Sequence, residues 1–569
     1  MRVKIIRLIV AGFFILIAGD LFYGQAIQGR FYYQQSLNNR VRVISLNGRR
    51  GRILDRNGIV LAENRTAFQL TLTPQAMGDT DAVFDFLSGI LRVPADKLLT
   101  RYRSLKTADF APVLMASDIT RAAAMAVEEN KFRFPELMVE EGFRRVYPFA
   151  ESCGHVVGYV GKANPARLDQ MKDYGYTAES FVGYLGAEEF YDAQLRGVDG
   201  GVQVEVNSRG RQVALLGRKD PESGNDITLT VNSRLQQSAM QALGENRGAA
   251  IVMDRRTGEI LALASAPSFD PNAFSAAAGA PAIQEYFQDR DAPLLNRAVN
   301  GVFPPGSVFK VVAATAALDL GKISPTMNFN CPGFLDLGGT RFGCAHVHGT
   351  QNLTEAIVHS CNVYFFHLGL ILKPENLYRY GRGFGLGQLT RVDLPYEKPG
   401  RLPRPRDRLL NGRRWYPGDT LNTVIGQGDV LATPLQLTRL MATVANEGII
   451  VQPHILAKIG DKAVAQFHLA RRLKVHSDTW PLLKTALRRT VADVSGTAHA
   501  VDIPGVEISG KTGTAQSGGG AHHAWFVGYS QGTKTEIVIT VFLEHGGSSQ
   551  NACVAARQIL LTAQQEGIL

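Results

Sequence analysis

Pro304-Pro-Gly-Ser-Val-Phe-Lys310 is the stretch that decides how this chain is interpreted. Proline is tolerated where a helix begins, so Ser307 is expected in the first turn of a helix. Lys310 then lies one turn later on the same face, which places an amine beside the hydroxyl. A serine needs such a base to become a nucleophile, and a lysine can serve only when its pKa is lowered. Ser307 is the only serine in the sequence with a lysine three residues later, which makes it the candidate nucleophile.

A second polar motif, Ser360-Cys-Asn362, interrupts an apolar and largely helical segment at 353–366. Ser360 can relay a proton to a leaving amine, and Asn362 can hydrogen-bond a substrate amide. Alone, the pair would be interpreted as a cap at a helix end. In a chain that also carries the serine and lysine, we expect both side chains in the catalytic site.

The third motif, Lys511-Thr-Gly-Thr514, is expected at the edge of a strand. Gly513 has no side chain, so a substrate backbone can approach it and add as an extra strand. The hydroxyls of Thr512 and Thr514 are candidates for binding a carboxylate. Alone, this motif would be interpreted as a turn between strands.

The three motifs together assign roles that none carries alone. Lys511 can supply the positive charge that lowers the pKa of Lys310. The backbone N–H groups of Ser307 and Thr514 can form an oxyanion hole. Three such motifs in this order are the set used by serine acyl-enzymes.

Hydrophobic patterns around the motifs predict an α+β fold. Apolar, β-branched strands are expected near both ends of the second half of the chain, at 226–231, 248–254, 259–264, 505–513, 521–529 and 535–544, with helices at 233–243 and 550–565. Strands at both ends with a helical centre indicate one antiparallel sheet with helices on both sides. A polar, turn-rich boundary at 218–225 separates this domain from an earlier mixed region.

An apolar stretch near the N-terminus predicts a membrane anchor. Residues 8–24 are almost entirely apolar and follow a short segment, 1–7, that carries Arg2, Lys4 and Arg7. About 17 residues is near the lower limit for spanning a bilayer. Basic flanks stay in the cytoplasm, so the tail 1–7 is expected inside and the rest of the chain outside. A cleaved signal peptide is the alternative, but no clear small-residue cleavage site ends the stretch.

The composition is that of a folded and basic protein. The chain has 569 residues, 45% hydrophobic and 20% charged, with a net charge of +10. This length accommodates two to four domains. No run of five basic residues and no nucleic-acid-binding motif is present in the sequence, so no nucleic acid partner is expected. We interpret the charge as solvated surface, with a weak attraction to anionic lipid as the alternative.

The chain resembles the class B penicillin-binding proteins, the monofunctional D,D-transpeptidases of peptidoglycan synthesis, over almost its whole length. Beyond the three motifs, the similar segments are Arg49–Gly58, Gly154–Gly161, Gly186–Tyr191, Asn300–Lys310, Ile425–Gly428 and His523–Gly528. The lead-in to the serine is similar to that of the elongation subtype, the penicillin-binding protein 2 group. The resemblance implies an elongated α+β pedestal domain of the dimerisation type at 25–220 and a transpeptidase domain at 221–569.

The resemblance implies a serine acyl-transfer reaction during cell elongation. Ser307 attacks the penultimate D-alanine carbonyl of a stem peptide with Lys310 as the base, D-alanine leaves, and an amine of a neighbouring stem completes the cross-link. β-Lactams are expected to acylate the same serine. The implied partners are peptidoglycan stem peptides or the product of the lipid-linked precursor, a SEDS-type glycan polymerase, rod-shape scaffold proteins and the bacterial inner membrane. The catalytic domain is expected in the periplasm.

Two other functions remain compatible with these motifs. A D,D-carboxypeptidase or β-lactamase uses the same residues and admits water to the acyl-enzyme, although a β-lactamase is usually a compact soluble domain. A catalytically silent scaffold or β-lactam receptor of the wall-synthesis complex is the second alternative. A silent scaffold usually lacks the serine or the lysine, and both are present here. We therefore expect a transpeptidase.

Cysteines and histidines cluster between the first two motifs. Cys344, His346 and His348 lie close together in sequence, with Cys331 and Cys361 on either side. Cys331 and Cys344 flank a glycine-rich segment that resembles a hairpin loop, and export permits a disulfide between them. Free, packed side chains are the second interpretation. Zinc is the third, because Cys and His suit this metal and some elongation-type relatives carry a metal site in this region, although the spacing matches no standard finger. No other cofactor is expected.

Overall fold

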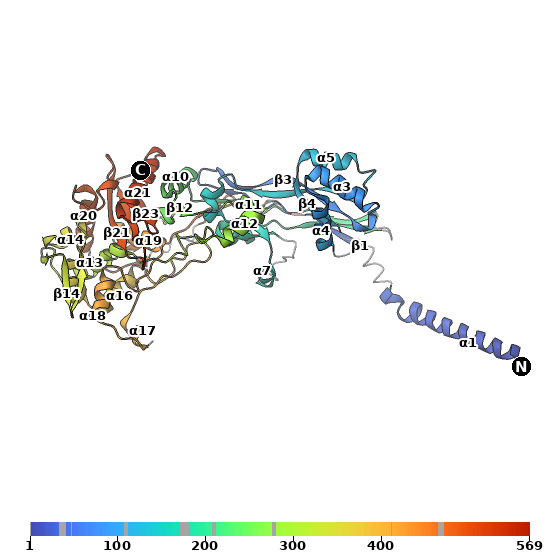
Figure 1. Ribbon diagram of the computed structural model, residues 1–569, viewed down its shortest axis with the longest axis horizontal. Coiled ribbons are helices and arrows are strands. Elements are labelled where there is room, and N and C mark those ends of the chain that lie inside the picture. Colours follow the sequence, from blue (N-terminus) through green and yellow to red (C-terminus); the bar gives the residue numbers. More distant parts are fainter. Residues whose placement is uncertain are drawn as a thin grey trace. The chain divides into compact units, whose positions relative to one another are not determined.

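The computed structural model describes residues 2–32, 41–46, 48–106, 112–170, 181–206, 212–275, 280–410, 412–464 and 471–569. The chain forms two compact units, each discontinuous in sequence (Figure 1). The first unit comprises Met1–Gly51, Thr66–Phe143 and Arg196–Gly224, and the second comprises Arg52–Arg65, Arg144–Leu195 and Asn225–Leu569. The linear domain boundaries given above stay predictions.

The first unit begins with an exposed apolar helix. α1 (Arg2–Phe22) continues into a π-helical turn at Tyr23–Ile27. Among the described residues, Val3–Ile27 is the one helical stretch that is long and apolar enough to cross a membrane, and none of it is buried in the protein. The predicted anchor at 8–24 lies within it, so the chain carries an N-terminal helix with the properties of a single membrane anchor.

The remaining described residues of the first unit form a three-stranded sheet, one end of a seven-stranded sheet and three helices. One sheet is antiparallel and has the order β1 (Val41–Leu46), β8 (Gly200–Val206) and β9 (Gln212–Lys219). The end of β3 (Val60–Leu72) pairs with β4 (Val113–Ile119) and β5 (Leu137–Val146). The helices are α3 (Thr80–Leu91), α4 (Ala95–Leu105) and α5 (Arg121–Glu129). Apolar side chains such as Phe84 of α3 and Leu98 of α4 join Leu70 and Met115 of the strands in one core, because each helix buries one apolar face.

A five-stranded antiparallel sheet forms the centre of the second unit, in the order β12-β11-β23-β22-β21. Its strands are β11 (Gly248–Asp254), β12 (Ile260–Ala266), β21 (Glu507–Ala515), β22 (His523–Gln531) and β23 (Ile537–Leu543). β21 ends the order, so one of its sides is free of a strand partner in this sheet. The predicted strands at 248–254, 259–264, 505–513, 521–529 and 535–544 are all present, and the predicted α+β fold is confirmed.

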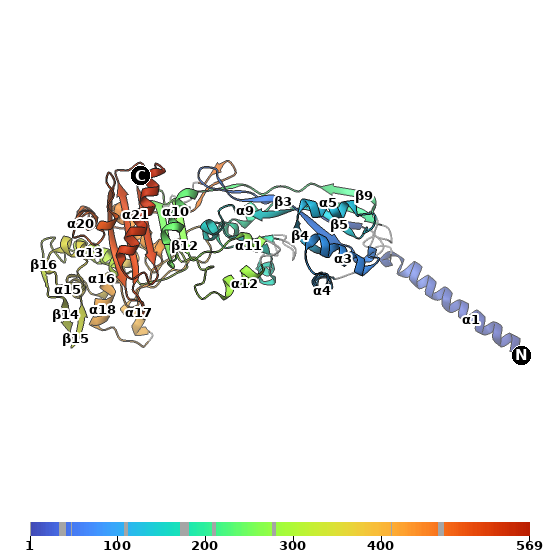
Figure 2. The same ribbon diagram turned by 45° about the horizontal axis from the view of Figure 1, so that its top comes forward.

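Helices cover both faces of this sheet. On one face lie α10 (Ser233–Leu243) and α21 (Ser549–Gln565), which pack on each other (Figure 2). On the other lies α19 (Pro434–Ala445), with α13 (Lys310–Asp319) in the same core. Successive residues of β22 divide between the two cores: Phe526 packs on the side of α10 and α21, and Trp525 on the side of α19. Both residues are fully buried, which explains why the strands are apolar throughout rather than alternating.

The remaining elements of the second unit surround this sheet. Helices α14 (Leu353–Val358), α15 (Asn362–Leu372), α16 (Pro374–Gly383), α18 (Pro417–Val424) and α20 (Thr479–Ala492) pack near α13. Two small hairpins, β13 (Phe329–Cys331) with β16 (Gly349–Gln351) and β14 (Phe334–Leu337) with β15 (Thr340–Gly343), connect α13 to α14. Short strands β2 (Ile53–Leu54), β10 (Ile227–Leu229), β18 (Leu456–Ile459) and β19 (Lys462–Ala463) extend the sheet of β3 at its start, in the order β19-β18-β10-β2-β3. The segment 144–195 contributes α6 (Gly154–Val157), β6 (Tyr159–Lys162), α7 (Pro165–Gln170), β7 (Phe181–Tyr184), α8 (Gly186–Phe190) and α9 (Asp192–Leu195).

Candidate active site

The candidate nucleophile lies in a tight turn that another strand approaches closely. Ser307 is half-buried in a 3₁₀ turn, Gly306–Phe309, which leads directly into α13 at Lys310. Gly306 has a φ of +55°, and a Cβ there would stand 3.0 Å from the carbonyl oxygen of Thr514. Its N–H donates to the carbonyl oxygen of Gly426 at 3.0 Å. The turn therefore needs glycine at this position, and it brings the first motif against the third.

Lys310 joins the first motif to the second. The side chain is fully buried. Its Nζ donates to the carbonyl oxygen of Ser360 at 2.7 Å and to Oδ1 of Asn362 at 2.7 Å, and it lies 3.3 Å from Oγ of Ser360. Burial lowers the pKa of Lys310 to about 8, although three nearby thiols oppose the shift. A measurable share of this amine is therefore neutral near neutral pH, as a general base requires.

Ser360 holds a strained backbone conformation. It lies between α14 and α15 with a φ of +55°, a region that costs a residue with a side chain on the order of 1–2 kcal/mol. The two flanking helices are separately capped: Asn352 and Glu355 form a capping box at the start of α14, and Cys361 caps α15. The capped helices fix the break between them, and that break presents the Ser360 carbonyl and hydroxyl to Lys310.

The third motif lies on β21, at the end of the sheet order. Lys511 is fully buried, and its Nζ donates to the carbonyl oxygen of Thr512 at 3.1 Å. Burial and then the charge of Lys310 lower the pKa of Lys511 well below its usual range. The main cause of the lowered Lys310 pKa is burial, rather than the Lys511 charge that the sequence suggested.

Gly513 is constrained by the protein itself. A Cβ at this position would stand 3.0 Å from the carbonyl oxygen of Pro305, 3.1 Å from Cβ of Trp525 and 3.2 Å from Cγ2 of Val308. The glycine thus lets the serine turn pack on β21, a requirement that adds to the substrate approach predicted from the sequence.

The two threonines of this motif differ in exposure. Thr512 is buried, and its Oγ1 donates to Oγ1 of Thr497 at 2.8 Å. Thr514 is exposed. Of the two hydroxyls predicted to bind a carboxylate, that of Thr514 is the accessible one. Thr497 was not found from the sequence, because no spacing links it to the motif.

A cysteine and histidine cluster lies directly behind the second motif. The side-chain ligand atoms of Cys331, Cys344, His348 and Cys361 lie within 4.8 Å of one another. All the cysteines are free thiols, so the predicted Cys331–Cys344 disulfide is wrong. Each of these two sulfurs instead lies 3.5 Å from Nδ1 of His348.

The cluster also corrects the predicted ligand set. His346 does not belong to it, although its ring centroid lies 5.9 Å from that of His348. Cys331 and Cys361 take part instead, because the hairpin pair β13–β16 and the start of α15 bring them to the same place. Cys361 lies inside the second motif, and this position in the sequence could have indicated that it belongs to the cluster.

Asn362 connects this cluster to the lysine. Its N–H donates to Sγ of Cys344 at 3.1 Å, and its Nδ2 donates to the carbonyl oxygen of Gly343 at 3.1 Å. Its Oδ1 accepts from Lys310. A hydrogen bond from Cys361 lowers the pKa of Cys344, while that of Cys361 is raised. The thiol cluster therefore holds the residue that accepts a hydrogen bond from the Lys310 amine.

Known proteins share this arrangement of domains. The family described as "Penicillin binding protein transpeptidase domain" matches residues 248–561, and "Penicillin-binding Protein dimerisation domain" matches residues 45–229. A curated relative, the peptidoglycan D,D-transpeptidase MrdA of Acinetobacter baumannii, is 34% identical over 570 residues, which cover 95% of this chain and 85% of the relative.

Solved structures agree with the sequence relatives. Penicillin-Binding Protein (PBP2) of Helicobacter pylori, in a complex with MreC, matches with a TM-score of 0.82 and 28% identity over 93% of this chain and 99% of that one. A chain from a structure entitled "Structural coordination of polymerization and crosslinking by a peptidoglycan synthase complex" matches with a TM-score of 0.74 and 32% identity over 98% of this chain and 97% of that one.

Proposed function

Because the chain belongs to the class B penicillin-binding proteins of the MrdA (penicillin-binding protein 2) type, we propose that it is a peptidoglycan D,D-transpeptidase that acts through a Ser307 acyl-enzyme during cell elongation. The observation that carries the serine mechanism is the buried Lys310 amine, held between Ser360 and Asn362 and three residues after the serine. The relatives' names favour cross-linking over hydrolysis and over a silent scaffold.

Acylation begins with the neutral form of Lys310. Oγ of Ser307 bonds to the penultimate D-alanine carbonyl carbon, and its proton passes to Nζ of Lys310. The bond to the terminal D-alanine breaks, and the leaving amine takes a proton by way of Ser360. Ser360 suits this relay because its hydroxyl lies 3.3 Å from Nζ, and a hydroxyl can donate to a neutral amine as well as accept from a charged one.

Deacylation reverses these proton movements. The amine of a neighbouring stem peptide attacks the ester carbonyl, loses its proton to Lys310, and releases Oγ of Ser307, which is reprotonated. The exposed Thr514 on β21 binds the substrate carboxylate, and its N–H pairs with that of Ser307 as the oxyanion hole. Lys511 and Gly513 shape the strand edge along which the substrate lies.

The same assignment implies a membrane setting and protein partners. The helix over Val3–Ile27 anchors the chain in the inner membrane, and the rest of the protein lies in the periplasm. A MreC-type rod-shape protein and a SEDS-type glycan polymerase are the proposed partners, since relatives occur in a complex with MreC and in a peptidoglycan synthase complex.

A zinc ion is the proposed occupant of the thiol cluster. Three thiols and one imidazole within 4.8 Å suit four-coordinate structural zinc, and zinc binding would displace the thiol protons. Bound by Cys331, Cys344, His348 and Cys361, zinc would supply rigidity to the segment behind Asn362. It takes no part in the acyl transfer.

Metal content tests this assignment. The full chain, purified without chelating resin, is expected to contain one zinc per chain by elemental mass spectrometry. Cys344→Ser and Cys361→Ser should lose it, and Cys553→Ala, outside the cluster, should keep it. A parent chain without zinc, or equal zinc in all variants, would overturn the assignment.

A cross-linking assay tests the activity. The full chain in detergent is incubated with uncross-linked glycan strands, and the digested products are separated by mass. Cross-linked dimers that lack one D-alanine are expected with the parent and not with Ser307→Ala, while Ser324→Ala, an exposed serine, behaves as the parent. Trimmed peptides without dimers would instead establish a carboxypeptidase, and unchanged strands would favour the scaffold.

A further inference from the structure

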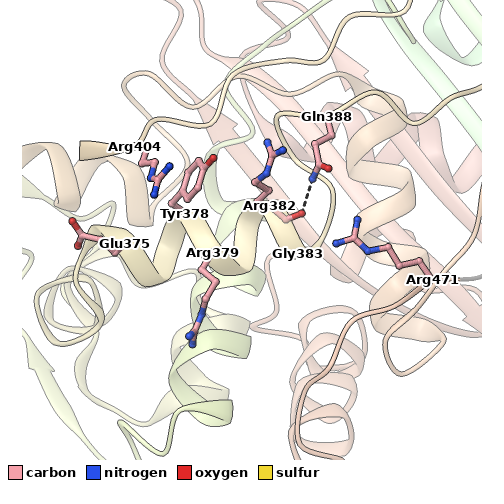
Figure 3. Close-up of a pocket in the computed structure, with 8 residues that line it drawn as sticks. All are labelled: Glu375, Tyr378, Arg379, Arg382, Gly383, Gln388, Arg404 and Arg471. Atoms are coloured by element: carbon pink, nitrogen blue, oxygen red, sulfur yellow. Dashed lines mark hydrogen bonds between the residues drawn. The ribbon is translucent and has the colours of Figure 1, made fainter. Parts of the chain in front are cut away.

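A basic pocket of about 560 Å³ lies on the unit that carries the three motifs, and none of its lining residues belongs to those motifs (Figure 3). Small-ligand sites commonly have volumes of roughly 300–1,000 Å³. Four arginines line the pocket, Arg379, Arg382, Arg404 and Arg471, against a single carboxylate, that of Glu375.

Three separate segments of the chain bring these arginines together. Arg379 and Arg382 lie on α16, Arg404 precedes α17 (Pro405–Leu410), and Arg471 lies on β20 (Arg471–Arg472), which pairs with β17 (Ile449–Ile450). In Figure 3 Arg382 and Arg404 lie on the same side of α16, Arg471 faces them from across the pocket, and Arg379 points the other way. All three of these arginines line the same pocket.

These arginines differ from others in the same unit. Arg408 is paired with Asp419 at 2.8 Å and with Asp429 at 2.5 Å, and Arg297 with Glu544 at 3.1 Å. In the part of the chain that the structure describes, no carboxylate lies within ion-pair distance of Arg382, Arg404 or Arg471. Like charges held together without a counter-charge favour the binding of an anion, and a guanidinium matches carboxylate or phosphate oxygens in two-point contacts.

Two further side chains indicate a ligand larger than a simple ion. The guanidinium of Arg404 lies 5.1 Å from the ring centroid of Tyr378, and this stacking holds its plane. Nε2 of Gln388 donates to the carbonyl oxygen of Arg382 at 2.8 Å, which fixes the amide and leaves its oxygen available to accept. An aromatic face and an amide beside three cations suit a sugar or peptide that carries acidic groups.

We propose that this pocket is a second binding site for the glycan–peptide substrate, where Arg382, Arg404 and Arg471 hold its oxyanions. The proposal rests on the proposed function, which supplies a substrate rich in such groups: the carboxylates of the stem peptides and the pyrophosphate of the lipid-linked precursor. α16 connects the pocket to the reaction, because its far side packs on α13 and Gly381 lies against Phe309 of the serine turn. The pocket would bind one part of the substrate while the stem peptide of the same substrate reacts at Ser307.

Binding to the full chain in detergent tests the proposal, with benzylpenicillin added first to occupy Ser307. The probes are a reduced disaccharide-tetrapeptide, the same compound with its carboxyls amidated, and inorganic pyrophosphate, each measured by calorimetry. Arg382→Gln, Arg404→Gln and Arg471→Gln should each weaken, about fivefold, the binding of whichever probe the parent chain binds. This loss is smaller than that of a buried charged hydrogen bond, because solvent screens exposed charges. Glu375→Gln should strengthen it about twofold, and added salt should weaken it.

Matched controls are available on the same elements. Arg472 is the next residue of β20 and points to the opposite face of the strand, and Arg406 is an exposed arginine two residues after Arg404. Arg472→Gln and Arg406→Gln should leave the affinity unchanged. Loss in the controls equal to that in the pocket variants would show a diffuse basic surface and overturn the site.

The probes also identify the source of the oxyanion. Binding of the disaccharide-tetrapeptide but not pyrophosphate supports stem-peptide carboxylates, and the reverse supports the lipid-linked precursor. Binding by neither probe, or binding of the disaccharide-tetrapeptide that is unchanged when its carboxyls are amidated, would overturn the proposal. The intact mass of each sample reports the benzylpenicillin adduct independently. An adduct without pocket binding removes only this site, whereas a parent without an adduct removes the proposed function.

Discussion

The catalytic motifs and the arginine pocket lie in one unit but hold their positive charges in opposite ways. Lys310 and Lys511 are fully buried, and burial is the main cause of their lowered pKa values. Arg382 and Arg471 are exposed. A buried ammonium is driven toward its neutral form and becomes a base, whereas an exposed guanidinium binds anions and performs no proton transfer. Burial thus separates the chemistry of the motifs from the recognition assigned to the pocket.

Removal of the buried amine is expected to have the largest effect. Lys310→Ala should slow acylation by benzylpenicillin about 10³-fold, since a general base contributes roughly 10²–10⁴ to the rate. Lys322→Ala, an exposed lysine just after α13, should have no effect. The rate is measured with a fluorescent penicillin on the full chain. A Lys310→Ala rate within tenfold of the parent would mean that another group is the base.

Loss of the residue that orients the amine should cost less. Asn362→Ala removes the acceptor of one Lys310 hydrogen bond and the amide that donates to Gly343. We expect acylation to slow roughly 10- to 100-fold, the worth of a hydrogen bond to a charged group. Asn376→Ala on α16 serves as the control. An unchanged rate would show that the lysine does not need this partner.

The pH dependence should follow the lysine. With the pKa of Lys310 lowered to about 8, the neutral fraction and the acylation rate should rise about tenfold per pH unit below pH 8 and level off above it. The unfolded chain keeps this proton to a higher pH, so the folded state also gains stability as pH rises from about 8 toward 10.5. A rate that is flat from pH 6 to 9 would contradict the assignment of the base.

Gly513 tests the packing of the two motifs rather than the chemistry. Gly513→Ala places a methyl group 3.0 Å from the Pro305 carbonyl oxygen, so the turn or the strand must shift. Overpacking of this kind costs about 1–3 kcal/mol, which thermal unfolding should report as a lower Tm. Gly519→Ala is the control, because a Cβ there would meet nothing within 4 Å. Equal Tm values would show that the turn yields without cost.

The pocket variants should have the smallest effect on acylation. Arg382→Gln, Arg404→Gln and Arg471→Gln, combined in one chain, should leave the benzylpenicillin rate within about twofold of the parent, since none of them touches the motifs and exposed charges act weakly at a distance. The same fluorescent penicillin assay measures it. A tenfold lower acylation rate would show that the pocket arginines influence the catalytic motifs and would contradict the separation of the two regions.

Sequence reasoning found the elements that are contiguous in the chain. The strands of the central sheet were placed within about two residues because both of their faces are buried, which leaves uninterrupted apolar runs. The three motifs were recognised because each is a short, continuous string. We expected the three motifs to lie close together, and the packing of Gly306, Lys310 and Gly513 brings them together.

Sequence reasoning did not find the features that are assembled from distant segments of the chain. The thiol cluster depends on how two hairpins and α15 meet. The sequence therefore favoured a disulfide between Cys331 and Cys344, and it grouped His346 with Cys344 and His348 although His346 lies outside the cluster. The arginine pocket is built from three separate segments without a spacing rule, and no pattern in the sequence marks Arg404 and Arg471 as neighbours.

The central claim is that Ser307 is the acylated nucleophile, and the intact mass of the full chain after incubation with benzylpenicillin tests it most directly. We predict one stable adduct per chain, mapped to the peptide containing Ser307, absent in Ser307→Ala and retained in Ser324→Ala. An adduct that persists in Ser307→Ala, or a parent chain that leaves the drug intact and carries none, would contradict the account.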